Sequence, residues 1–228
     1  MVVSHLLRPF IAFLLVVTLL EFSGIDLWVA DQLYHWSGDM WVWRDAWLTA
    51  TLIHAGGRQL VAVLALTLLL LLVASYRLPS LRHFRSGLWY LLVTALLSGL
   101  VINIGKRLTL IDCPWDLLRY GGTADYVRNF MSHARTGGVG GCFPAGHSSA
   151  GFGWFGFYYF VRYYWPRWQW WALAAVLLLG LVFGIGQQLR GAHFVSHDVW
   201  TLGLCWFIAT TLALWWLRSM PLLTGTDD

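Results

Sequence analysis

The chain has 228 residues, of which 58% are apolar, 17% aromatic and 11% charged. Because an ordinary soluble domain is roughly a quarter charged, this composition excludes intrinsic disorder and most water-soluble folds. The formal net charge of +4 would suggest an acidic partner in a soluble protein, but in so apolar a chain the basic residues are better explained by membrane orientation. We therefore expect an integral membrane protein with no nucleic-acid partner.

Uncharged apolar runs predict six transmembrane helices in a single all-α, polytopic domain that covers residues 1–228. Each span needs about 20 residues, so the length leaves no room for a separate soluble domain. We expect the spans at residues 9–23, 59–76, 87–105, 149–161, 169–186 and 199–217. The first run follows a basic residue, as in a secretory signal, but no small-residue cleavage site comes after it, so we expect this span to stay uncleaved.

A stretch rich in tryptophan and aspartate separates the first two spans, between Asp26 and Trp47. Such a mixture is typical of helices that lie at the membrane interface. We expect a pair of interfacial helices here rather than a seventh span. The histidines outside the motifs described below are expected to be amphipathic interface residues; they are His5, His35, His54, His83 and His133.

Basic residues in short loops predict the orientation of the chain. With a cytoplasmic N-terminus, the cytoplasmic side holds Arg8, Arg77, Arg82, Arg85, Arg162, Arg167 and Arg218. This distribution follows the positive-inside rule, in which short loops carry the signal. The long segment from Lys106 to Ser148 and the turn from Arg190 to Asp198 then face the periplasm or exterior of a bacterial-type inner membrane.

Candidate chemistry is concentrated in three segments on this outer face. Lys106 lies at a helix end, and the sequence PAGHSS places His147 just before an apolar helix. Ser148 and Ser149 are expected to cap that helix, so that its free N–H groups, with Gly146, receive an anion. The third segment, RGAHFVSHD, contains His193 and His197 four residues apart, which predicts that both lie on one helical face.

Two histidines, a lysine, an arginine and a helix N-terminus meet the requirements of phosphoryl transfer through a phosphohistidine. One neutral imidazole attacks phosphorus, cations such as Lys106 and Arg190 hold the oxygens, and a protonated imidazole supplies the leaving group with a proton. This chemistry needs no metal or cofactor. A zinc site of His193 and His197 with His147 or Asp198 is the alternative, which we disfavour because the nearby lysine and arginine would oppose a cation.

In order and spacing these residues resemble the three motifs of the type 2 phosphatidic acid phosphatase (PAP2) superfamily, which includes membrane lipid phosphatases and soluble vanadium haloperoxidases. The family motifs are Lys-x6-Arg-Pro, Pro-Ser-Gly-His and Ser-Arg-x5-His-x3-Asp. Here they correspond to Lys106-x6-Cys113-Pro114, PAGH at 144–147 and GQQLRGAHFVSH at 186–197. The resemblance extends from about residue 59 onward. It implies that His193 is the nucleophile and His147 the general acid.

The chain departs from the family pattern at both arginines. Cys113 and Gln187 stand at the two positions. Arg190 follows Gln187 by three residues, so it lies on nearly the same helical face and is expected to reach the same phosphate oxygens. Arg119 or Arg135 is expected to supply the second cation.

The family aspartate that orients the nucleophile is also displaced. His197 occupies its position, and Asp198 follows one residue later. Either group is a candidate for fixing the tautomer of His193, and both alternatives stay open at this point.

Two of the three cysteines lie in the outer segment. They are Cys113 and Cys142, whereas Cys205 lies in the last span and is expected to be a small core residue. An oxidising compartment would permit a disulfide between the first two, which would tie the first motif to PAGH.

The resemblance implies a metal-independent membrane lipid phosphatase without a cofactor. Its substrate would be a lipid phosphate or diphosphate of the phosphatidic acid, phosphatidylglycerophosphate, undecaprenyl diphosphate or lipid A class, and its other partners membrane lipids. A lipid-to-lipid phosphotransferase is one alternative, and a non-catalytic membrane protein or transporter on the same fold is another. The oligomeric state is left open.

Overall fold

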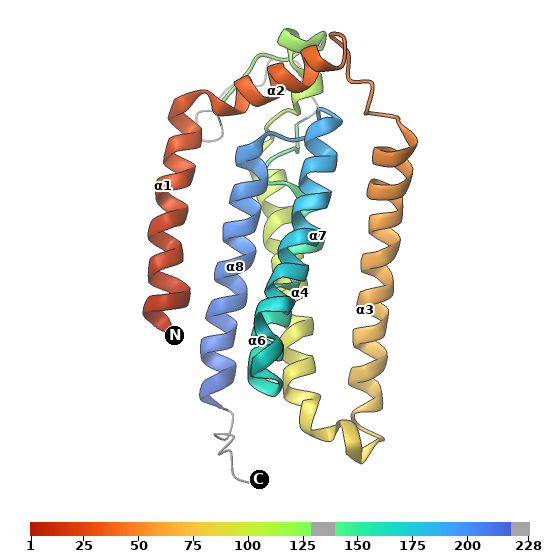
Figure 1. The fold of residues 1–228 in the computed structure, drawn as a ribbon, viewed down its shortest axis with the longest axis vertical. Helices are drawn as coiled ribbons and strands as arrows, with labels where there is room; N and C mark the ends of the chain where they lie inside the picture. Colours follow the sequence, from red (N-terminus) through yellow and green to blue (C-terminus); the bar gives the residue numbers. More distant parts are fainter. Residues whose placement is uncertain (129–139, 220–228) are drawn as a thin grey trace.

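The computed structural model describes residues 1–128 and 140–219, and this part of the chain is built from helices, with one isolated bridge between Leu117 and Ala124 in place of any strand. Long helices run side by side along the longest axis (Figure 1). They are α1 (Arg8–Ser23), α3 (Gly57–Ala74), α4 (Arg85–Thr109), α7 (Gln169–Leu189) and α8 (Val195–Arg218). The predicted all-α class is confirmed.

Five helices in the described part are long and apolar enough to cross a membrane. They are Val2–Ser23, Trp47–Ala74, Pro79–Asp116, Pro166–Leu189 and Val195–Arg218. The first two begin earlier than predicted because π-helical segments, Val2–Leu7 and Trp47–Gly56, continue directly into α1 and α3.

The run predicted as a sixth span, residues 149–161, is divided. It falls across α5 (Gly146–Phe152), a 3₁₀ turn (Gly153–Phe155) and α6 (Gly156–Tyr164). Glycine weakens a helix interior, and three glycines occur between residues 151 and 156. Among the described residues, five helices are thus long and apolar enough to cross a membrane without a break, and the count of six stays a prediction.

Small residues bring α5 close to α7. A Cβ on Gly151 would lie 2.4 Å from the backbone nitrogen of Gly180, and a Cβ on Gly180 would lie 2.2 Å from the ring of Phe152. Helices in membranes approach closely where such small residues face one another. This contact fixes α5, which begins with the PAGH motif, against the helix that leads to the third motif.

An aromatic core joins α4, α6 and α8. Tyr90 stacks on Trp216 with ring centroids 4.7 Å apart, and the Tyr90 hydroxyl donates to the carbonyl of Ala209 at 2.9 Å. Tyr159 and Thr210 share a 2.6 Å hydrogen bond. The hydroxyls of Tyr90, Tyr159 and Thr210 are thus paired, as a nonpolar environment favours.

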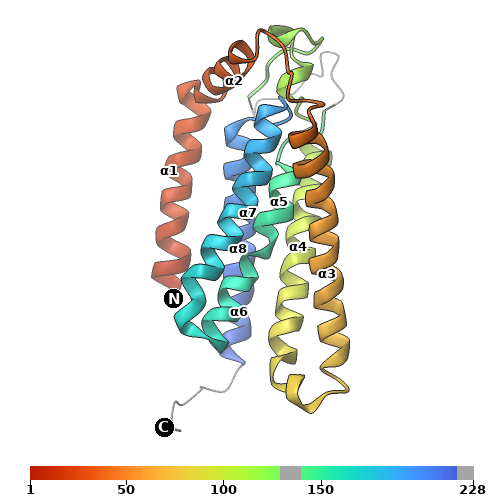
Figure 2. The same cartoon turned by 45° about the vertical axis from the view of Figure 1, so that its right-hand side comes forward.

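A single helix, α2 (Ile25–Trp36), crosses one end of the bundle (Figures 1 and 2). The predicted pair of interfacial helices is wrong in this respect, because turns and extended chain follow α2 up to residue 46. Glycine and aspartate at 38 and 39 adopt positive φ there, which ends the helix.

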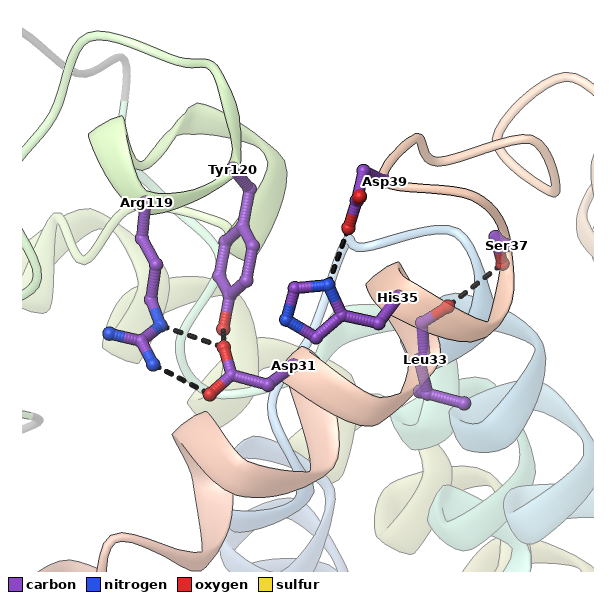
Figure 3. A network of polar contacts seen from close by, with 7 residues as sticks. All are labelled: Asp31, Leu33, His35, Ser37, Asp39, Arg119 and Tyr120. Carbon is purple, nitrogen blue, oxygen red and sulfur yellow. Dashed lines mark hydrogen bonds and ion pairs between the residues drawn. The ribbon is translucent and has the colours of Figure 1, made fainter.

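Polar contacts fasten α2 to the segment that follows α4. Arg119 donates two hydrogen bonds to Asp31 at 2.7 and 2.6 Å, and the Tyr120 hydroxyl donates to the same carboxylate at 2.9 Å (Figure 3). The ion pair lowers the pKa of Asp31. Tyr34 and Trp41 pack on Tyr120 beside these contacts, with ring centroids 5.2 and 5.4 Å away.

The two ends of the bundle carry different segments. The end near α2 also holds the connections from α4 to α5 and from α7 to α8, which contain the three motifs (Figure 2). The α3–α4 turn, with its 3₁₀ segment Pro79–Phe84, lies at the opposite end (Figure 1). The candidate chemistry is therefore gathered at one end, away from the basic residues of that turn.

Candidate active site

Lys106 and the PAGH turn are in direct contact. Lys106 lies in the last turn of α4 as predicted, and a Cβ on Gly146 would stand 2.9 Å from its Cε and Nζ atoms. A Cβ on Gly105 would likewise lie 2.8 Å from Pro144. Glycine at these positions lets the lysine of the first motif lie against the backbone of the second.

Cys113 and Cys142 form a disulfide, with Cα atoms 5.3 Å apart. This Cα separation lies within the usual range for a disulfide. Two hydrogen bonds reinforce the link, from the Cys142 N–H to the Ile111 carbonyl at 2.9 Å and from the Gly140 N–H to the Asp112 carboxylate at 2.7 Å. The first two motifs are thus held together covalently and through the backbone.

The turn before His193 is held by the first motif and by an aromatic ring. The Trp115 N–H donates to the Gly191 carbonyl at 2.9 Å. Gly191 has φ +73°, and a Cβ there would lie 2.4 Å from the Trp41 ring. Only glycine satisfies both the backbone conformation and the close contact.

His193 lies at the convergence of the three motifs. Its side chain is 6% exposed, and Lys106, His147 and His197 are close enough to act on its charge. Burial lowers the pKa of His193 well below its ordinary value. The ring is therefore neutral near neutral pH, which is the form a nucleophile needs.

His193 precedes α8, whose N-cap is Phe194, so the predicted shared helical face with His197 is wrong. The α8 N-terminus has no cap from its own segment. Asp26 of α2 accepts a hydrogen bond from the Ser196 N–H at 2.9 Å instead. Burial raises the pKa of Asp26.

His197 is fully buried between two aromatic rings. Its ring centroid is 5.2 Å from that of Phe143, 5.4 Å from that of Phe194 and 5.9 Å from that of His193. Neither of its ring nitrogens has a hydrogen-bond partner in the described part of the chain. The structure thus gives His197 an aromatic environment and no hydrogen bond to the candidate nucleophile.

Asp198 points toward α7. Its carboxylate accepts a hydrogen bond from Gln188 at 2.6 Å and interacts with the Ser148 hydroxyl. A Cβ on Gly184 would lie 2.8 Å from it. Within residues 1–128 and 140–219, Nδ1 of His193 has no hydrogen-bond partner, so neither Asp198 nor His197 holds this nitrogen.

The two serines after His147 do not cap α5. The helix begins at Gly146 with Ala145 as N-cap, and within the described ranges no side-chain capping hydrogen bond is present at this N-terminus. Ser148 donates back to the Ala145 carbonyl at 3.2 Å, and Ser149 donates to the Gly146 carbonyl at 2.6 Å. The predicted capping role is wrong because both hydroxyls lie inside the first turn, where carbonyls are the nearest partners.

A further histidine lies against His147. The rings of His54 and His147 are stacked, with centroids 3.9 Å apart and planes inclined by 12°. Gln187 bonds to Nδ1 of His54 at 2.9 Å, and Arg190 donates to Gln187 at 3.3 Å and to the Arg44 carbonyl at 2.8 Å.

Cations surround His147. Lys106, Arg190 and Arg58 all lie close enough to act on the charge of its ring. The expected proximity of Arg190 to Gln187 is confirmed by their hydrogen bond. Sequence reasoning assigned His54 to the interface and did not single out Arg58. The sequence did offer a signal for these two residues. His54 and Arg58 are four residues apart, at the start of an apolar run on the same side of the membrane as the motifs.

The sequence also matches a known family over the region that holds these motifs. The PAP2 superfamily model matches residues 87–221. The chain belongs to the PAP2 superfamily. This match runs from α4 through α8 and starts later than the resemblance at residue 59 suggested. The chain has no significant match among curated proteins or among solved structures.

PAP2 proteins are generally phosphatases, so membership supports a hydrolase that acts on phosphate esters. Of the cations predicted to replace the PAP2 arginines, Arg119 is bound to Asp31 (Figure 3). The Arg119 guanidinium thus binds α2 to the segment that follows α4. Arg135 lies outside the described residues. Among residues 1–128 and 140–219, no group of three or more His, Cys, Asp or Glu side chains is placed to hold a metal ion.

Proposed function

We propose that this PAP2 protein is a membrane lipid phosphatase that removes a phosphate or diphosphate group through a phosphohistidine at His193. The observation that supports this most directly is the convergence of three separate segments. Lys106 lies against Gly146, the residue before His147, and His193 is close enough to both Lys106 and His147 for their charges to act on it. A neutral imidazole, a second imidazole and a cation in one partly buried place are the groups that phosphoryl transfer requires.

The first half-reaction transfers the phosphoryl group to the protein. A ring nitrogen of His193 attacks phosphorus while the bond between phosphorus and the lipid oxygen breaks. His147 gives its proton to that oxygen, so the lipid leaves as an alcohol, or as a monophosphate if it began as a diphosphate. Burial and the cations around His147 oppose a proton on its ring and lower its pKa. The negative charge of a bound phosphate would offset both effects.

In the second half-reaction, water attacks the phosphorus of the phosphohistidine and the phosphorus–nitrogen bond breaks. His147, now neutral, takes a proton from that water, and inorganic phosphate leaves. Lys106 and Arg190 stabilise the negative charge on the oxygens in both steps. Their electrostatic effect is large because the site is partly removed from water.

A lipid substrate is favoured by the position of the site. The motifs lie at one end of helices that are long enough to span a membrane, so a phosphate carried by a membrane-anchored lipid would lie at the right depth. We propose the phosphatidic acid, phosphatidylglycerophosphate, undecaprenyl diphosphate and lipid A classes as candidates. Membrane lipids would be the other partners.

The proposed orientation places the site at the periplasm or exterior of a bacterial-type inner membrane. Basic residues of the short loops lie at the opposite end, which the positive-inside rule assigns to the cytoplasm. The disulfide at the site supports this, because disulfides persist in oxidising compartments.

The test is to incubate purified protein with a panel of lipid phosphates and to measure free phosphate and any phosphorylated acceptor lipid. We expect phosphate release that vanadate inhibits and that His193→Ala and His147→Ala abolish, while both variants keep the thermal stability of the wild type. Phosphorylated acceptor without free phosphate would instead show a phosphotransferase. The absence of both products with every lipid would refute the proposal and favour a non-catalytic role.

A further inference from the structure

We propose that His54 is a phosphate-binding group of this site, and that Arg190 and Gln187 together hold it in the tautomer that this role requires. The proposal rests on the proposed phosphatase function. It assigns a role to a residue that lies before the part of the chain matched by the PAP2 family. It also explains how the chain functions with glutamine at 187, where the family pattern has arginine.

His54 is positioned by an unusual stretch of backbone. It lies near the end of the π-helical segment Trp47–Gly56, directly before α3. Such segments are rare and frequently occur at functional sites. Gly57 follows, and a Cβ there would stand 2.6 Å from the ring of Phe183. The close approach of α3 to α7 brings His54 against His147 and Gln187.

The hydrogen bonds determine the tautomer of His54. Arg190 can only donate, so the Gln187 atom that it contacts at 3.3 Å is the carbonyl oxygen Oε1. The Gln187 amide nitrogen therefore faces His54, at 2.9 Å from Nδ1. That nitrogen can only donate, so Nδ1 accepts. The proton of neutral His54 is thus on Nε2, which becomes a hydrogen-bond donor.

A neutral donor suits this position better than a second cation would. The His54 and His147 centroids are 3.9 Å apart, and His147 must carry a proton to act as the general acid. Two stacked imidazolium rings would repel each other. A neutral His54 with Nε2–H offers the phosphate a hydrogen bond without opposing that proton.

Gln187 thus acts as a positioning residue. An arginine at 187 would donate directly to a phosphate oxygen. Here Gln187 donates to His54, and His54 in turn donates to the phosphate. Arg58, one helical turn after His54, acts on the charge of both His54 and His147. Arg58 thus adds a further cation near His147, besides Lys106 at the Gly146 turn.

The first experiment replaces the donor. We expect His54→Ala to lower kcat/KM by about 100-fold, as loss of one transition-state hydrogen-bond donor does, and to weaken inhibition by vanadate by a similar factor. His54→Gln keeps a donor nitrogen and should recover part of both. His35→Ala is the matched control, since His35 is an exposed histidine on α2 paired with Asp39, and it should behave as wild type.

The second experiment tests the tautomer and does not depend on turnover. In protein with ¹⁵N-labelled histidine, the His54 signal, assigned by its loss in His54→Gln, should show protonated Nε2 and shift when vanadate is added. Gln187→Glu should move the proton to Nδ1, because a carboxylate accepts where the amide donated. The double variant His54→Ala with Gln187→Arg should recover activity relative to His54→Ala, since the family arginine is restored.

Wild-type activity and vanadate inhibition in His54→Ala would overturn the proposal, and so would a His54 signal with the proton on Nδ1. These outcomes differ from a failure of the phosphatase function. In that case the wild-type protein would release no phosphate from any lipid, and the vanadate-dependent shift of the His54 signal would still decide whether His54 binds phosphate.

Discussion

The contact between Gly146 and Lys106 leads to a quantitative prediction for Gly146→Ala. The added Cβ would lie 2.9 Å from Cε and Nζ of Lys106, whereas ordinary contact begins at 3.4 Å. The ammonium group must therefore withdraw by about 0.5 Å, the difference between these distances. Because the end of a lysine side chain is flexible, we expect the protein to fold with little loss of stability.

Catalysis should be more sensitive than stability to this shift. A misplacement of about 1 Å in an active site can cost about 100-fold in rate, so half that distance corresponds to about 10-fold. Such a loss adds about 1.4 kcal/mol to the activation barrier. The assay is kcat/KM for phosphate release from a lipid phosphate, measured together with thermal unfolding in detergent.

Gly99→Ala provides the matched control. Gly99 lies on the same helix as Lys106, and a Cβ there would meet nothing within 4 Å. We expect unchanged activity and slightly higher stability, because alanine is the better helix former. If Gly146→Ala kept the kcat/KM of the wild type, Lys106 would not be positioned by this contact in the way described. Equal losses in both variants would refute the reasoning too.

Three further predictions concern the disulfide, the orientation and the α2 contact. Reduction of the disulfide should lower the free energy of unfolding by about 3 to 4 kcal/mol on the chain-entropy model. The measurement is the Tm with and without dithiothreitol. An unchanged Tm would show that the disulfide does not constrain the chain. Leu118→Cys, at a position 60% exposed, should react with an impermeant thiol reagent in intact cells while Arg82→Cys should not, and the reverse pattern would invert the topology. Arg119→Ala should cost up to about 1 kcal/mol at neutral pH, as for a partly exposed ion pair. Because Arg119 lowers the pKa of Asp31, this difference should disappear as the pH falls through that lowered value, and a difference constant down to acidic pH would contradict the ion-pair explanation.

The spans were predictable from sequence because a bilayer demands long apolar runs whatever their packing. The ends were not, and residues 47–56 show why. This segment contains Trp47 and His54, residues typical of the membrane interface. In the structure it is helical and continues directly into α3. The interruption between α5 and α6 was also missed, because its glycines are explained by tertiary contacts: Gly151 lies against α7, whereas Gly153 and Gly156 lie against α4.

At the site, local motifs identified His147, His193 and Lys106, because their roles depend on short spacings. Contacts between residues far apart in the sequence could not be predicted. Arg119 was expected to bind phosphate, but its partner Asp31 lies 88 residues earlier. His54 was assigned to the interface, but Gln187, which bonds to it, lies 133 residues later. Such partners are chosen by tertiary packing, which a single sequence does not display.

The hydrogen bond between Asp26 and the Ser196 N–H joins residues 170 positions apart, and this has a consequence for biosynthesis. A ribosome delivers the N-terminal elements first, so α2 is made long before α8, whose N-terminus it caps. His54 likewise precedes Gln187. The candidate nucleophile His193, the start of α8 next to it and the partner of His54 all belong to the last part of the chain to be made. A nascent or truncated polypeptide that lacks α8 therefore has no assembled candidate site, and we expect the proposed hydrolytic activity only after insertion is complete.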